Sequence, residues 1–104
     1  MESNNDSSIF AKKLLEKKDT KLIGALLGKY FIFQNDKVLE EAIKLCFGEM
    51  SDEKFFDVLR CAIYNDKVIV FQIMESNNFA YDKKYFKQLA FTWKSSKCID
   101  FFIN

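Results

Sequence analysis

Residues 59–75 carry the clearest structural pattern in the chain and read Leu59-Arg60-Cys61-Ala62-Ile63-Tyr64-Asn65-Asp66-Lys67-Val68-Ile69-Val70-Phe71-Gln72-Ile73-Met74-Glu75. The first part has the apolar spacing of an amphipathic helix, a short polar turn follows, and the last part is apolar nearly all round. Apolar positions that recur with a period near 3.6 indicate helix. The segment therefore predicts a helical hairpin, in which a tight turn joins an amphipathic helix to a short buried one.

Outward from this hairpin, the same spacing predicts helices along the rest of the chain, and no long stretch alternates with period two. We expect helices over residues 8–18, 21–34, 36–48, 51–63, 68–74, 82–93 and 96–104. Side chains able to accept hydrogen bonds from a first helical turn mark several starts. These expected N-caps are Thr20, Asn35 or Asp36, Ser51, Asp66 and Asp82. Gly48 is the expected stop of the third helix, and Leu22 is expected on a buried face.

The chain is thus expected to be all-α, with about seven short helices. A length of 104 residues suits a single hydrophobic core. We predict one helical domain over residues 8–104 after a disordered tail over residues 1–7. Two architectures fit this pattern: antiparallel helical hairpins stacked into an α-solenoid, or a compact helical bundle.

Weak internal repeats favour the stacked arrangement. Asn35-Asp36-Lys37-Val38 returns as Asn65-Asp66-Lys67-Val68, and residues 87–102 share the frame of residues 59–75 at an offset of 28. These two segments resemble the ankyrin repeat, because residues 59–75 align without gaps with that family's L-H-L-A-A-R-N-G-H-L-E-I-V-K-L-L-L. The small residue of the pattern falls at Ala62 and Ala90, whereas the family's T-P-L-H opening and Gly-rich hairpin are absent. The resemblance implies stacked helical hairpins that bind other proteins through their surface.

The composition excludes most familiar catalytic chemistry. The chain has no His, so Ser–His and Cys–His nucleophilic arrangements cannot be built from it. Cys46, Cys61 and Cys98 are scattered in apolar surroundings, which favours buried, reduced thiols over a structural zinc site. No Gly-rich phosphate loop is present. We therefore expect no enzymatic activity, no catalytic residue, no metal and no cofactor.

The chain is expected to stay inside the cell. It begins with a polar, acidic segment unlike a secretory signal peptide, and its apolar runs are far shorter than the roughly 20 residues of a membrane span. We predict a soluble, cytoplasmic protein that does not contact a membrane. The excess of Lys, Ile, Phe and Asn suggests an AT-rich coding sequence. If the source is a virus or a parasite, the cytoplasm in question is that of a host cell.

Charge is distributed unevenly although the net charge is only +1. Residues 10–30 and 82–100 have formal charges of +4 and +3, whereas residues 35–57 have −4. A net charge near zero gives no overall field that favours nucleic acid. We expect a partner protein, bound through the turns and the acidic middle of the chain by Gln34, Asp36, Glu40, Glu41, Asp52 and Glu53.

Other interpretations stay open. A small inhibitor or immunity-type protein would use the acidic segment as a phosphate mimic to block one enzyme or nucleic-acid-binding effector. Nucleic-acid binding through the C-terminal lysines is less favoured, because the neighbouring Tyr85, Phe86 and Trp93 are expected in the core. The apolar residues 101–103 either pack inside the domain, form a homodimer or continue a longer array.

Overall fold

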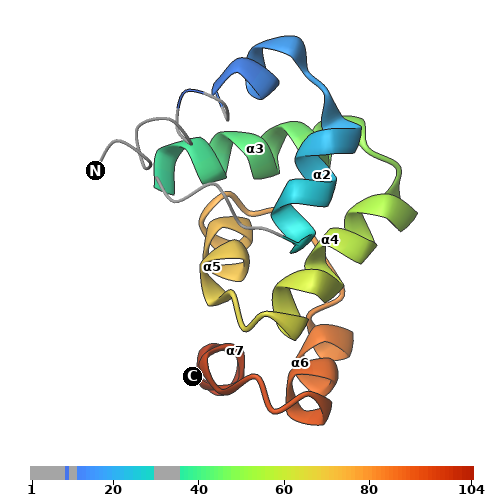
Figure 1. Cartoon of the computed structure of the whole chain (residues 1–104). Coiled ribbons are helices and arrows are strands. Elements are labelled where there is room, and N and C mark those ends of the chain that lie inside the picture. The colour runs from blue at the N-terminus through green and yellow to red at the C-terminus, as the bar shows by residue number, and fades with distance from the viewer. Residues whose placement is uncertain (1–8, 10–11, 30–35) are drawn as a thin grey trace. The chain divides into compact units, whose positions relative to one another are not determined.

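The computed structural model describes residues 9, 12–29 and 36–104 (Figure 1). Within these ranges the regular structure is helical and contains no strand, which confirms the all-α prediction. Residues 12–17 are helical. The helices after them are α2 (Thr20–Lys29), α3 (Asp36–Glu49), α4 (Asp52–Tyr64), α5 (Val68–Ser76), α6 (Lys83–Thr92) and α7 (Ser96–Ile103). The predicted tail over residues 1–7 and the predicted contact Gln34 lie outside the described residues.

The chain divides into two compact units, residues 1–58 and 59–104, and the division falls inside α4. In the first unit α2 packs against α3. Gly24 of α2 lies against the side chain of Met50, the residue after α3, because a Cβ at Gly24 would lie 3.0 Å from Cε of Met50. The core of the unit consists of Leu14, Ile23, Leu27, Val38, Leu39, Ala42, Ile43, Cys46, Phe55 and Val58.

Three sequence expectations in the first unit are wrong. The side chain that caps α2 is Asp19, whose Oδ1 accepts a hydrogen bond from the Leu22 N–H at 3.2 Å, and Thr20 is already helical. Leu22 itself is 41% exposed, because the buried stripe of α2 runs through Ile23 and Leu27. Gly48 does not stop α3, which continues to Glu49 without a left-handed glycine. Ser51 does cap α4, since its Oγ accepts from the Lys54 N–H at 3.3 Å.

The second unit contains the end of α4 together with α5, α6 and α7. Helix α7 packs against both α5 and α6 (Figure 1). At the centre lies the fully buried Phe71. Its ring centroid is 5.7 Å from the ring centroids of Tyr81 and Phe86 and 5.2 Å from that of Phe102. Aromatic pairs at this spacing stabilise a core beyond simple burial. The other core side chains are Leu59, Ala62, Ile63, Val70, Ile73, Met74, Ala90 and Cys98.

Turns of the same geometry follow four described helix ends, at Lys18, Asp66, Asn78 and Lys94, and two of them join α4 to α5 and α6 to α7. Asp66 and Lys94 lie at equivalent positions in them and have left-handed φ values of 53° and 54°. In each turn a backbone N–H just past the left-handed residue closes the preceding helix, Lys67 on Ala62 at 2.8 Å and Ser95 on Ala90 at 3.0 Å. This is the Schellman arrangement of helix ends. The same helix end recurs at Lys18 and Asn78, so it is common to the helices of this chain and is not specific to the 28-residue offset.

Candidate functional site

The most distinctive contact of the second unit joins the turn at Asp66 to the start of α7. One carboxylate oxygen of Asp66 accepts from the Cys98 N–H at 3.0 Å, and the other accepts from the Lys97 N–H at 3.2 Å. Such N–H groups lack partners inside a helix and are usually satisfied by its own N-cap side chain. Here the N-cap residue Ser95 donates its hydroxyl instead to the carbonyl of Ile63 at 2.5 Å. The sequence predicted that Asp66 caps the start of α5. It caps α7 instead, because the Ser95 hydroxyl bonds to Ile63 and leaves the Lys97 and Cys98 N–H groups without an acceptor from Ser95.

The ionisation of these groups follows from the same contact. Burial by itself would raise the pKa of Asp66, but hydrogen bonds from the Cys98 and Lys97 N–H groups lower it below its usual value. Burial, and then the neighbouring Asp66 carboxylate, raise the pKa of the Cys98 thiol to about 12. Burial likewise raises the pKa of Cys46 to about 11. Both cysteines are therefore protonated and unreactive at neutral pH.

Two aromatic rings lie on the surface beside these turns. Tyr64 is the last residue of α4 and Trp93 follows the end of α6, and their ring centroids are 4.6 Å apart with the planes tilted by 51°. Tyr64 is 45% exposed and Trp93 56% exposed. We call Tyr64 and Trp93 the ring pair. The prediction that Trp93 is buried is wrong, because α6 ends at Thr92 and the chain turns away from the helix at Trp93.

Tyr85 and Phe86 agree better with the prediction that these aromatic side chains lie in the core. Phe86 is fully buried, and Tyr85 is half-buried with its ring centroid 5.0 Å from that of Phe86. Asp82 caps α6 as predicted, since its Oδ1 accepts from the Tyr85 N–H at 3.1 Å. Of the three aromatic residues expected in this core, Trp93 alone lies exposed.

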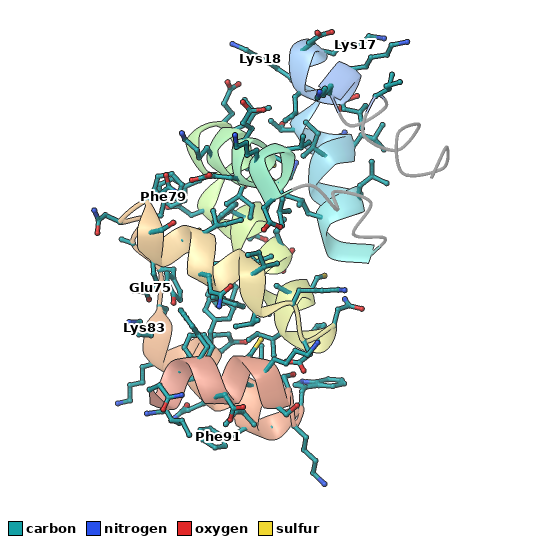
Figure 2. The ribbon with its side chains drawn as sticks, turned by 90° about the vertical axis from the view of Figure 1, so that its left-hand side faces the viewer. Lys17, Lys18, Glu75, Phe79, Lys83 and Phe91 are labelled. Atoms are coloured by element: carbon teal, nitrogen blue, oxygen red, sulfur yellow. The ribbon has the colours of Figure 1, made fainter. Side chains whose placement is uncertain are left out.

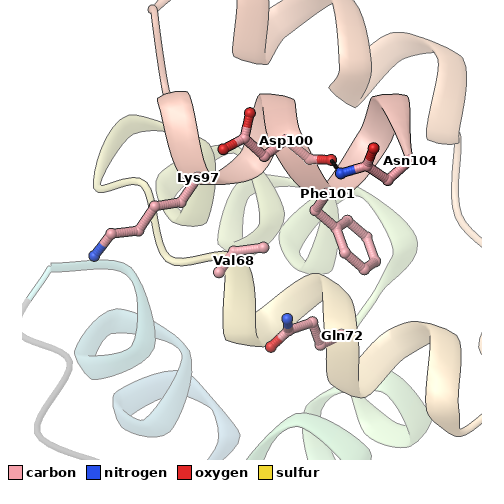
Figure 3. A pocket seen from close by; sticks show the side chains of 6 residues that line it. All are labelled: Val68, Gln72, Lys97, Asp100, Phe101 and Asn104. Atoms are coloured by element: carbon pink, nitrogen blue, oxygen red, sulfur yellow. Dashed lines mark hydrogen bonds between the residues drawn. The ribbon is translucent and has the colours of Figure 1, made fainter.

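An open groove of about 490 Å³ runs between α5 and α7 (Figure 3). We call it the α5–α7 groove. Its apolar walls are the half-buried Val68 and Phe101, whereas its polar side chains are exposed. The polar lining residues are Gln72, Lys97, Asp100 and Asn104. The groove begins beside the Asp66 contact, because Val68 follows that turn and Lys97 donates its N–H to Asp66.

A second polar cluster ties the end of α5 to the start of α6. Oε2 of Glu75 accepts from the Tyr81 hydroxyl at 2.7 Å and lies 2.8 Å from Nζ of Lys83 (Figure 2). Lys83, and then Tyr81, lower the pKa of Glu75 through these hydrogen bonds. Burial raises the pKa of Tyr81 well above its usual value. The cluster is part of the scaffold, because Glu75 is already bonded to two side chains of its own unit.

The predicted acidic contacts lie in the first unit and form two groups. Asp36, Glu40 and Glu41 are on the first turns of α3, where Asp36 and Glu41 are exposed and Glu40 is half-buried. Asp52 and Glu53 are exposed in the first turn of α4, beyond the other end of α3. A helix of 14 residues is about 21 Å long. The sequence-continuous acidic segment is therefore not one cluster in space.

Among the described residues, no group of three or more His, Cys, Asp or Glu side chains is arranged to hold a metal ion. In the same part of the chain, no helix has both the length and the apolar character needed to cross a membrane. Tyr64 and the groove residues of α5 were not among the predicted contacts. The 28-residue offset pairs the exposed Gln72 with the exposed Asp100, two of the groove residues, but it pairs Tyr64 with Thr92 rather than with Trp93.

The chain is thus an all-α protein whose second unit presents an exposed aromatic pair and a polar-rimmed groove. No protein-family model matches it, and neither the curated proteins nor the solved structures include a match. The ankyrin resemblance accordingly stays a prediction that rests on residues 59–75 and 87–102.

Proposed function

We propose that the chain is a non-enzymatic protein–protein interaction module that binds its partner through the surface of residues 59–104. The observation that carries this proposal is the exposed ring pair of Tyr64 and Trp93. Tyr and Trp are enriched among the few interface residues that supply most of the binding energy. Two adjoining rings that are half open to water offer apolar area that a partner would bury.

Hydrogen bonds within the second unit hold the backbone on either side of the ring pair in place. Tyr64 precedes the turn closed by the Lys67–Ala62 hydrogen bond, and Trp93 precedes the turn closed by the Ser95–Ala90 hydrogen bond. The Ser95 hydroxyl also links the two turns through the Ile63 carbonyl. A binding surface that is ordered in advance loses less conformational entropy on association, which favours affinity.

The α5–α7 groove extends this surface with chemistry suited to a polypeptide. Val68 and Phe101 provide apolar contact, and the amides of Gln72 and Asn104 provide hydrogen-bonding groups. Interfaces typically combine an apolar centre with a polar rim. The ring pair and the groove together give the second unit both components.

The test is affinity capture with the full chain from its cell of origin, after nuclease treatment, with mass spectrometry of the bound proteins. Trp93→Ala removes one ring of the pair. Phe91→Ala is a matched control, because Phe91 is 50% exposed and points away from α5 on the outer side of α6 (Figure 2). We expect one reproducible protein to be captured by the unmodified chain and by Phe91→Ala, and lost from Trp93→Ala. Capture that is equal for all three chains would contradict the proposal.

The alternative function is a small inhibitor that acts through the acidic residues of the first unit. The separation of Asp36, Glu40 and Glu41 from Asp52 and Glu53 by the length of α3 favours it less, since a phosphate mimic needs neighbouring charges. Such an inhibitor would abolish one defined activity at a one-to-one ratio. It would lose this effect in Glu40→Gln/Glu41→Gln and retain it in Trp93→Ala.

Three further proposals accompany the interaction function. The stacked-hairpin architecture is supported by the packing of consecutive helices against each other, α2 on α3 and α6 on α7. A homodimer through the C-terminal helix is supported by Ile103, which is 56% exposed on α7. Light scattering of the purified chain and of Ile103→Asp tests the dimer.

A cytoplasmic location stays a prediction from the sequence, which imaging of the tagged chain tests.

A further inference from the structure

We propose that the α5–α7 groove binds an acidic peptide segment of the partner protein. A carboxylate of the segment contacts Lys97, and an apolar side chain of the segment packs between Val68 and Phe101. The proposal rests on the interaction function and adds the chemical class of the partner.

The second unit carries a positive formal charge. Residues 59–104 contain seven basic and four acidic residues, a formal charge of +3. Three of the four carboxylates are engaged within the unit: Asp66 at the start of α7, Asp82 at the start of α6, and Glu75 with Tyr81 and Lys83. By contrast, four exposed lysines have no carboxylate within ion-pair distance in the described part of the chain, although the charge of one of them, Lys97, helps to lower the pKa of the nearby Asp66. They are Lys84, Lys87, Lys94 and Lys97.

Lys97 brings one of these charges to the groove. Its backbone N–H is bonded to Asp66, so the residue is anchored in the first turn of α7 at the end of the groove that Val68 also lines (Figure 3). A carboxylate placed there would form a charge-assisted hydrogen bond with the ammonium group. Exposed charges at the edge of an interface also steer an oppositely charged partner toward it.

The remaining lining favours a peptide over a nucleic acid. The Gln72 side chain has no hydrogen-bond partner among the described residues, and Asn104 donates its Nδ2 to the Asp100 carbonyl at 2.7 Å, which leaves its side-chain oxygen to accept. These amides complement the N–H and C=O groups of a peptide backbone. The Asp100 carboxylate lies in the same groove and would repel a continuous phosphate backbone. A peptide can avoid that repulsion by placing a neutral residue there.

The experiment selects peptides from a random 12-residue phage library on the immobilised full chain. The enriched sequences are then synthesised with a fluorescent label and titrated in solution. We expect the enriched peptides to carry an excess of Asp and Glu and at least one large apolar residue. A fluorescent oligonucleotide of twelve thymidines, measured in the same buffer, serves as the nucleic-acid probe and is expected to bind more weakly.

Neutralising a lysine and neutralising an aspartate of the groove should change the affinity in opposite directions, and this locates the binding site. Lys97→Gln should weaken the selected peptide by about five- to tenfold, the range of one charge-assisted contact. Lys84→Gln is the matched control, because it removes an exposed lysine of the same unit that does not line the groove, and its effect should stay within about twofold. Asp100→Asn should strengthen binding, because it removes a like charge facing the acidic segment. Circular dichroism establishes that all three variants keep their helices.

Several results would overturn the proposal. Enrichment of neutral or basic peptides would do so, as would the absence of any enrichment. Equal losses in Lys97→Gln and Lys84→Gln would show a diffuse charge effect rather than a site in the groove. Tighter binding of the oligonucleotide, lost in Lys97→Gln, would assign the groove to single-stranded nucleic acid. If the peptide selection fails or the two lysine variants lose binding equally, the proposed interaction function can still hold. It holds if a protein is captured by the unmodified chain and lost from Trp93→Ala.

Discussion

The carboxylate of Asp66 accepts a 3.0 Å hydrogen bond from the backbone N–H of Cys98, 32 residues further along the chain. A side chain in the turn after α4 thereby caps α7, while the residue at the N-cap position of α7 bonds elsewhere. The contact joins the turn that follows Tyr64 to the first turn of α7, which begins three residues after Trp93. The geometry of the proposed binding surface therefore depends on a long-range cap.

Removing this cap should destabilise the second unit. We expect Asp66→Ala to lower the free energy of unfolding by about 1–2 kcal/mol, because two N–H groups lose their acceptor and the left-handed turn loses a residue that tolerates it. Asp66→Asn should cost less, since Asn also tolerates a positive φ. Urea unfolding followed by circular dichroism measures both values. An unchanged midpoint for Asp66→Ala would mean that the cap contributes nothing.

Acid should weaken the fold through Glu75 and Asp66. Lys83 and Tyr81 lower the pKa of Glu75, and for Asp66 the Cys98 and Lys97 N–H groups outweigh burial and lower its pKa. A carboxyl group with a lowered pKa in the folded state stabilises the fold above its unfolded pKa of about 4. This stabilisation is lost as the pH falls through the folded value.

We therefore expect the free energy of unfolding to decrease as the pH falls below about 5, and to decrease less in Glu75→Gln/Asp66→Asn. Urea titrations at several pH values provide the measurement. Because both groups are close to the surface, the effect should also shrink at high salt. Parallel pH profiles for the double variant and the unmodified chain would contradict this account.

The left-handed residue Lys94 offers a stabilising substitution. At φ 54° a lysine is strained by its Cβ, whereas glycine adopts this conformation freely. Lys94→Gly should raise the free energy of unfolding by about 1 kcal/mol. Lys94→Ala removes the same charge without relieving the strain, so it should give no gain. Equal thermal midpoints for the two variants would show that the turn is not strained at this position.

Substitution of two glycines of the first unit by alanine should change the stability by different amounts. Gly48 lies inside α3 and a Cβ there would meet open space, so Gly48→Ala should stabilise by about 0.5–1 kcal/mol through helix propensity alone. At Gly24 the new Cβ would press on Met50, whose flexible end must shift, so the gain should be smaller. Thermal unfolding of the two single variants compares them directly. A larger gain at Gly24 than at Gly48 would contradict the packing described for α2.

The local parts of the fold were predictable from the sequence. The 3.6-residue spacing located the helices, and the N-caps Ser51 and Asp82 followed from side-chain chemistry within three residues. The error at Trp93 arose at a helix end. The periodic position i+8 assumes that the helix continues, but the chain leaves α6 just before that residue.

The surface that we propose for binding could not be predicted in the same way. The Asp66–Cys98 contact and the ring pair each join residues about thirty positions apart, and local propensity contains no information about such pairs. The acidic segment is continuous in sequence, but its residues lie in two groups because α3 lies between them. The 28-residue offset relates Asp66 to Lys94, but the same turn also occurs at Lys18 and Asn78 and is therefore common to helix ends of this chain.

The central claim is that the ring pair forms the energetic centre of a protein-binding surface. Its most direct test is the affinity of the captured partner for the unmodified chain, Trp93→Ala and Phe91→Ala, measured by calorimetry with circular dichroism as the folding control. We predict that Trp93→Ala weakens binding by at least about tenfold and that Phe91→Ala stays within about twofold of the unmodified chain. A partner that binds Trp93→Ala as tightly as the unmodified chain would place the interface elsewhere on the molecule and contradict the account.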